Sequence, residues 1–128
     1  WGIVVREDNP VASKTFADGQ IISSLRVILP RRAIVRSEIK TWFSDLVKDE
    51  NVVMYHNLPS LSLHFIGSGI GDALLCVEGA YSIRPSSGLR FVPLAPERLA
   101  RHKFVRRKNH RLSKAGEIFW SQLRNPDR

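Results

Sequence analysis

Long hydrophobic runs, paired cysteines and catalytic motifs are missing from this sequence of 128 residues. Charged residues or glycine interrupt every apolar segment before it reaches the roughly 20 residues that a membrane-spanning helix needs. We therefore expect a soluble chain with no membrane partner. The single cysteine, Cys76, cannot form an internal disulfide, and its place in the apolar run 73–77 predicts a small buried side chain. A reducing, cytoplasmic setting fits this composition.

Metal-binding and catalytic patterns are also absent. The histidines fall on different predicted elements, and no two have metal-ligand spacing, so we expect neither a metal nor another cofactor; they are His56, His64, His102 and His110. No serine lies in a Gly-x-Ser-x-Gly motif, and no acid, base and nucleophile form a coherent set, so an enzyme is not predicted. The glycine-rich run 67–71 follows a predicted helix and precedes a predicted strand, the reverse of a phosphate loop. It predicts a helix end and a tight turn.

Acidic residues are the minority, with 12 Asp and Glu against 20 Lys and Arg, a formal charge of +8. Such a balance raises the expectation of a nucleic-acid or acidic partner. Much of the excess is concentrated near the end, at Arg98, Arg101, Lys103, Arg106, Arg107, Lys108, Arg111 and Lys114. This cluster has two interpretations: a solvated strand edge and loop, or a nucleic-acid site spanning Arg101 to Lys114. Against the second, Phe104 is its only aromatic residue and no helix-turn-helix pattern is present.

Strand and helix patterns alternate along the chain, which predicts one α/β domain with helices on the faces of a sheet. With 43% hydrophobic residues, the chain can form one core but not two full-sized domains. The predicted strands span 1–6, 26–30, 51–56, 72–77, 89–94 and 103–107, and the predicted helices span 18–25, 33–47, 59–66 and the residues from 113 onward. The clearest amphipathic pattern is that of 33–47.

The best candidate for a ligand site is the segment Asn57, Leu58, Pro59 and Ser60, which joins a strand end to a helix start. In open α/β sheets ligands collect at such junctions, and the free N–H groups of the helix would suit a carboxylate or similar anion. The alternative is an ordinary helix cap without a ligand.

Several segments, in this order, resemble the effector-binding domain of LysR-type transcriptional regulators. Residues 1–12 resemble the strand and charged turn that enter the second subdomain, and 51–76 resemble its strand, helix, Gly-x-Gly turn and buried strand. The other matching segments are 27–31, 36–43, the Val-Pro-Leu strand in 91–94, and the basic turn and Leu-Ser-x-Ala helix start in 104–115. The resemblance covers nearly the whole chain.

This resemblance implies a periplasmic-binding-protein-like effector domain with a small molecule held between two α/β subdomains. The chain would supply the second subdomain, about 6–95, and the return strand and last helix of the first, about 96–128. The winged helix-turn-helix that reads DNA in the family would be absent, as though the sequence were cut from a longer protein. The implied partners are a small-molecule effector, for which the basic composition leaves an anion open, and further copies of the chain. Self-association is expected because the return segment has lost the sheet it would pack on.

Overall fold

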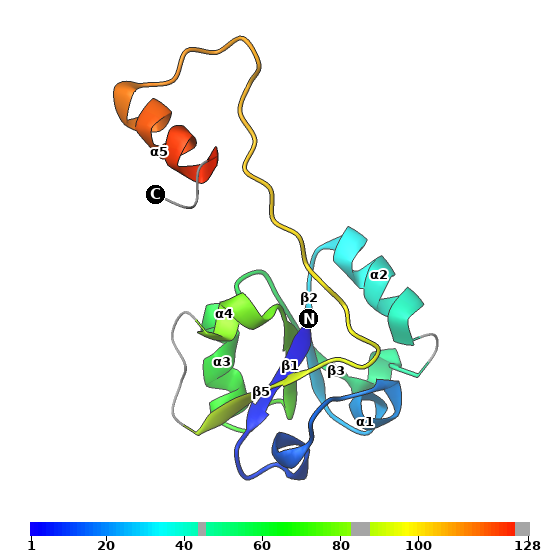
Figure 1. The fold of residues 1–128 in the computed structure, drawn as a ribbon. Coiled ribbons are helices and arrows are strands. Elements are labelled where there is room, and N and C mark those ends of the chain that lie inside the picture. Colours follow the sequence, from blue (N-terminus) through cyan, green and yellow to red (C-terminus); the bar gives the residue numbers. More distant parts are fainter. Residues whose placement is uncertain (44–45, 83–87, 125–128) are drawn as a thin grey trace.

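The computed structural model describes residues 1–43, 46–82 and 88–124, which form a five-stranded mixed sheet with helices on both faces (Figure 1). The strand order is β3-β2-β4-β1-β5; β2 runs parallel to β3 and β4, and β1 runs antiparallel to β4 and β5. The strands are β1 (Gly2–Arg6), β2 (Val27–Pro30), β3 (Val52–His56), β4 (Ala73–Cys76) and β5 (Leu89–Pro93). The helices are α1 (Gly19–Ser23), α2 (Ala33–Phe43), α3 (Pro59–Gly67), α4 (Glu78–Ser82) and α5 (Lys114–Arg124), with short 3₁₀ turns at Pro10–Ser13 and Asp49–Asn51.

Two hydrophobic layers lie on opposite faces of the sheet. In β1, Ile3 and Val5 belong to the layer covered by α1 and α2, whereas Val4 belongs to the layer covered by α3 and α4. All three side chains are fully buried. This follows from the strand alternation, since successive side chains point to opposite faces. The continuous apolar runs of β1, β2 and β4 are therefore those of strands covered on both sides.

The first helices begin as the sequence predicts, although α2 is shorter than expected. Asp18 caps α1, because its Oδ1 accepts a hydrogen bond of 2.9 Å from the Ile21 N–H. The predicted helix 33–47 ends at Phe43; residues 44–45 lie outside the described residues, and Leu46 and Val47 are no longer helical. Residues 46–48 precede the 3₁₀ helix Asp49–Asn51, which leads directly into β3.

The turn between α3 and β4 confirms the interpretation of the glycine run. Gly69 has a φ of 78°, the left-handed conformation that glycine adopts without strain. Asp72 then fixes the start of β4 to the start of β2. Its Oδ2 accepts from the Arg26 backbone N–H at 2.9 Å, and its Oδ1 accepts from the Arg26 Nη2 at 2.8 Å. The hydrogen bonds and charge of Arg26 hold the pKa of Asp72 below its ordinary value.

The C-terminal segment differs most from the sequence-based expectation. The predicted strand 103–107 is wrong: these residues form extended chain outside any strand, and α5 stands away from the sheet (Figure 1). A strand requires a neighbour for its N–H and C=O groups, and the five strands of the sheet offer this segment no such pairing. The segment instead folds onto α5, where the rings of Phe104 and Phe119 meet with centroids 5.7 Å apart. The Arg106 guanidinium lies 5.3 Å from the Trp120 ring centroid.

Candidate functional site

The four predicted site residues lie together at the junction of β3 and α3. Strand β3 ends at His56, and α3 begins at Pro59, so Asn57 and Leu58 form the connection. Asn57, Leu58 and Ser60 are exposed, and Pro59 is partly buried. The sequence pattern therefore located this connection correctly, and the side chains of its polar residues are accessible to a ligand.

The beginning of α3 carries no side-chain cap. The N-cap residue is Leu58, whose side chain has no polar atom, and the first turn of α3 contains no acidic residue. By contrast, α1 is capped by Asp18 and α4 has Glu78 in its first turn. Pro59, the first residue of α3, has no N–H. The free N–H groups of the first turn are therefore those of Ser60 and Leu61, which have no acceptor within the helix. No side chain therefore caps the first turn of α3, and its free N–H groups are open to solvent or to a ligand.

Basic residues share the edge of the sheet on which this junction lies. The parallel strands β2, β3 and β4 have their carboxyl ends there, and α2, α3 and α4 begin directly after them. Arg31 and Arg32 follow β2 and are exposed, and the Arg31 N–H donates to the His56 carbonyl at 2.8 Å. Two cations and the positive end of the α3 dipole therefore face solvent at this edge, an arrangement that favours anions.

Sequence reasoning missed Arg31 and Arg32. The signal was available, because they follow the predicted strand 26–30 as Asn57 follows the next strand. In a parallel sheet the carboxyl ends of neighbouring strands meet at one edge. The pairing of Pro30 with His56 in the β2–β3 register places the two connections side by side.

His56 supports this edge from within. Its side chain is 8% exposed, and its Nε2 lies 3.4 Å from the Leu75 carbonyl oxygen of β4. Strand β2 lies between β3 and β4, and its last residue, Pro30, has no backbone N–H to donate at this position. Within the described residues the His56 Nδ1 has no hydrogen-bond partner. Burial lowers the pKa of His56, and the contact with Leu75 opposes this shift only in part.

The structure also bears on the metal site, the membrane-spanning helix and the basic cluster that the sequence analysis considered. In the described parts of the chain, no three His, Cys, Asp or Glu residues lie close enough to hold a metal ion. No helix of those parts has the length and apolar character that crossing a membrane requires. Residues 101–111 of the basic cluster are all exposed, and Arg106 also lies 3.5 Å from a Glu117 carboxylate oxygen.

Comparison with known proteins gives a likeness in structure and none in sequence. No family model and no curated protein matches the chain. HinK, a LysR-family transcriptional regulator of Pseudomonas aeruginosa, has a similar structure with a TM-score of 0.67 and 18% identity, covering 98% of this chain and 44% of HinK. A second protein of that organism, described as a LysR-family regulator, gives a TM-score of 0.65 at 18% identity with the same coverage.

A binding protein outside the regulators is also similar. An ancestral arginine-binding protein bound to glutamine has a TM-score of 0.57 and 16% identity, covering 98% of this chain and 54% of that protein. The chain therefore has a periplasmic-binding-protein-like α/β fold, in the form also found in LysR-family regulators. It spans less than half the length of the two regulators.

Proposed function

We propose that this chain is the C-terminal part of the effector-binding domain of a LysR-type transcriptional regulator. The order of the sequence segments and the likeness of the fold to two such regulators support this assignment. In this proposal residues 6–95 form the second subdomain, and 96–128 return to a first subdomain supplied by the rest of the protein. The complete regulator would be a cytoplasmic homo-oligomer that contacts DNA through a separate winged helix-turn-helix.

The role proposed for the chain is to bind a small-molecule effector at the carboxyl edge of its sheet, without breaking any bond. The uncapped beginning of α3 carries this proposal. Asn57, Leu58, Pro59 and Ser60 would contact the effector, and the backbone N–H groups of the first turn would bind an anionic group such as a carboxylate. Arg31 and Arg32 would add positive charge at the mouth of the site. Binding would then shift the relative arrangement of the two subdomains and so reach the DNA-reading domain.

The site is tested by giving α3 the cap that it lacks. In Leu58→Asp the carboxylate would accept from the free N–H groups and occupy the position proposed for the ligand. We expect this variant to raise the free energy of unfolding by about 1 kcal/mol. It should also weaken binding of an anionic probe by about tenfold, which corresponds to about 1.4 kcal/mol, because the new carboxylate competes for the same N–H groups and repels the charge of the probe.

The measurement is calorimetric titration with acetate, benzoate, succinate and glutamine, with chemical denaturation on the same samples. Phe16→Asp is the control, because Phe16 is 50% exposed and lies just before α1, which covers the face of the sheet opposite α3. Equal affinity in the Leu58→Asp variant and the unaltered chain would contradict the site. So would the absence of binding by every probe at this edge.

A second function, nucleic-acid binding, is favoured by one observation: residues 101–111 expose their basic side chains on extended chain. Double-stranded DNA belongs in the same titrations at low and moderate salt. Binding that weakens steeply with salt, and that is lost when the basic residues of 101–111 are replaced by glutamine, would support this function in place of effector binding.

A further inference from the structure

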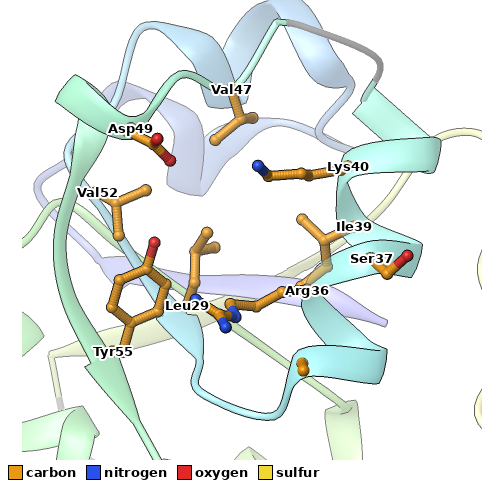
Figure 2. Close-up of a pocket in the computed structure, with 10 residues that line it drawn as sticks. Leu29, Arg36, Ser37, Ile39, Lys40, Val47, Asp49, Val52 and Tyr55 are labelled. Atoms are coloured by element: carbon orange, nitrogen blue, oxygen red, sulfur yellow. The ribbon is translucent and has the colours of Figure 1, made fainter.

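A cavity of about 430 Å³ lies on the other side of β3 from α3, between α2, the segment after α2 and the edge strand (Figure 2). None of the four residues proposed to bind the effector lines it. Its volume falls in the usual range for small-molecule sites, which are mostly apolar with a few polar groups that orient the ligand. The cavity is therefore a second place on this chain where a small molecule could be held.

The inner wall of the cavity is apolar. Leu29 of β2 and Ile39 of α2 are 6% and 2% exposed and form its floor. Val52 lies across the cavity from α2, and Val47 lies at the upper side between Asp49 and Lys40 (Figure 2). These apolar side chains come from four separate segments: β2, α2, the segment after α2, and β3. A compact apolar group would be desolvated against them.

The rim of the cavity is charged. Arg36 and Lys40 are one helical turn apart in α2, and both line the cavity. The Arg36 guanidinium lies 5.2 Å from the centroid of the Tyr55 ring, which holds it beside the opening. Asp49 faces Lys40 across the opening (Figure 2). Among the ion pairs of the described residues, none involves Arg36, Lys40 or Asp49.

We propose that this cavity binds a small monocarboxylate with an apolar body. The carboxylate lies between Lys40 and Arg36, and the apolar body rests on Leu29 and Ile39. Asp49 sets the selectivity, because its negative charge repels a second carboxylate on the ligand. The site is separate from the effector site proposed above and does not depend on it.

The probe for the test is hexanoate, with hexanol as its neutral analogue and succinate as a dianion, titrated into the 128-residue chain by calorimetry. Hexanoate should bind more tightly than either. Lys40→Gln should weaken hexanoate binding by about two- to fivefold, the range that one partly exposed charge pair contributes. Lys14→Gln, the same change at an exposed position outside the cavity, should leave hexanoate binding unchanged. Asp49→Asn should raise the affinity for succinate relative to hexanoate.

A steric variant tests the apolar part without altering charge. Val47→Phe should fill the cavity and abolish hexanoate binding, while circular dichroism shows that the chain remains folded. Leu58→Asp should leave hexanoate binding in the cavity intact, which distinguishes this site from the edge beside α3. Nuclear magnetic resonance shifts on adding hexanoate should map to α2 and β3.

Four results would overturn the proposal. In the first three, hexanoate fails to bind, hexanol binds as tightly as hexanoate, or hexanoate binds both Lys40→Gln and Val47→Phe as tightly as it binds the unaltered chain. In the fourth result, Val47→Phe changes the sedimentation of the chain, and the resonance shifts caused by hexanoate do not map to α2. This result would mean that a second copy of the chain, and not a small molecule, occupies the cavity.

Discussion

His56 is a single residue on which the edge of the sheet beside the proposed effector site depends. It is the last residue of β3, its ring crosses toward the Leu75 carbonyl of β4, and its Nδ1 is buried without a partner within the described residues. The neutral ring, with its proton on Nε2, donates a hydrogen bond to the Leu75 carbonyl oxygen. The imidazolium would place a second N–H, and a full charge, in an apolar layer formed by Val4, Ile28 and their neighbours.

The pH dependence of stability follows from this burial. The pKa of folded His56 is lowered from 6.5, so between 6.5 and that lower value the unfolded chain binds more protons than the folded chain. The free energy of unfolding should therefore fall as the pH drops through about 6.5, and the fall should end below the folded pKa. In His56→Gln this part of the pH dependence should disappear.

Urea denaturation from about pH 7.5 to about pH 5 would measure this slope. His64→Gln is the matched control, since His64 is an exposed histidine of α3, and it should keep the slope of the unaltered chain. A His56→Gln variant whose stability falls with pH as steeply as that of the control would show that another group is responsible.

Cys76, also at residue scale, illustrates what the sequence could predict. Its apolar neighbours predicted burial, and in β4 it is 2% exposed, with its thiol pKa raised to about 12 by desolvation. Arg31 and Arg32 follow a predicted strand as Asn57 does, but the sequence alone does not show that β2 and β3 are neighbours, which is what brings these residues to the site. The cavity could not be predicted either, since Leu29, Ile39 and Val47 meet there only after three segments have folded together.

Among the elements, local pattern predicted the five strands and four of the five helices of the described residues to within about four residues, and α5 was predicted although it contacts neither layer of the core. Strands β1 and β4 and helices α1 and α3 lie where their runs, caps and glycines indicated. Helix α4 was missed because its five residues are too few for helical periodicity to show. Residues 103–107 have strand composition but no strand to pair with, and pairing is a property of the whole fold.

The segment after β5 should therefore contribute little to the stability of the sheet. Its ring and charge contacts from Phe104, Arg106, Phe119 and Trp120 lie within the segment, and α5 stands apart from the sheet (Figure 1). A chain ending at Leu99 keeps Arg98, whose guanidinium lies 5.7 Å from the Trp42 ring centroid. We expect its free energy of unfolding to change by less than about 1 kcal/mol.

Thermal and urea denaturation, followed by circular dichroism, would measure the difference in the free energy of unfolding between the full chain and the chain ending at Leu99. Phe43→Ala in the full chain shows the contrast, because Phe43 is 5% exposed in α2 and its loss should cost about 3–5 kcal/mol. A shortened chain destabilised as much as Phe43→Ala would place α5 in contact with the sheet.

For the molecule as a whole, this arrangement leaves large apolar side chains of the C-terminal segment exposed to solvent. Leu99, Phe104 and Val105 are 71%, 65% and 85% exposed on the extended segment, and Ile118 and Phe119 are 53% and 51% exposed on α5. Phe104 and Phe119 are in contact, and exposed apolar side chains that gather in this way are uncommon on monomers. In the proposed regulator, the apolar face of this segment packs on the rest of the first subdomain. The 128-residue chain lacks that partner, so we expect two copies to associate through this face.

Sedimentation velocity over a range of concentrations should show the full chain forming dimers or larger species. The chain ending at Leu99 should sediment as a monomer under the same conditions, and Phe119→Ser should shift the full chain toward monomer. Because the charge of the segment is strongly positive, added salt should strengthen the association by screening repulsion between copies. A full chain that remains monomeric at high concentration and high salt would mean that α5 and residues 96–113 cover their own apolar face. Association that persists in the shortened chain would instead place the contact on the sheet, for which the edge of β3 is the exposed candidate.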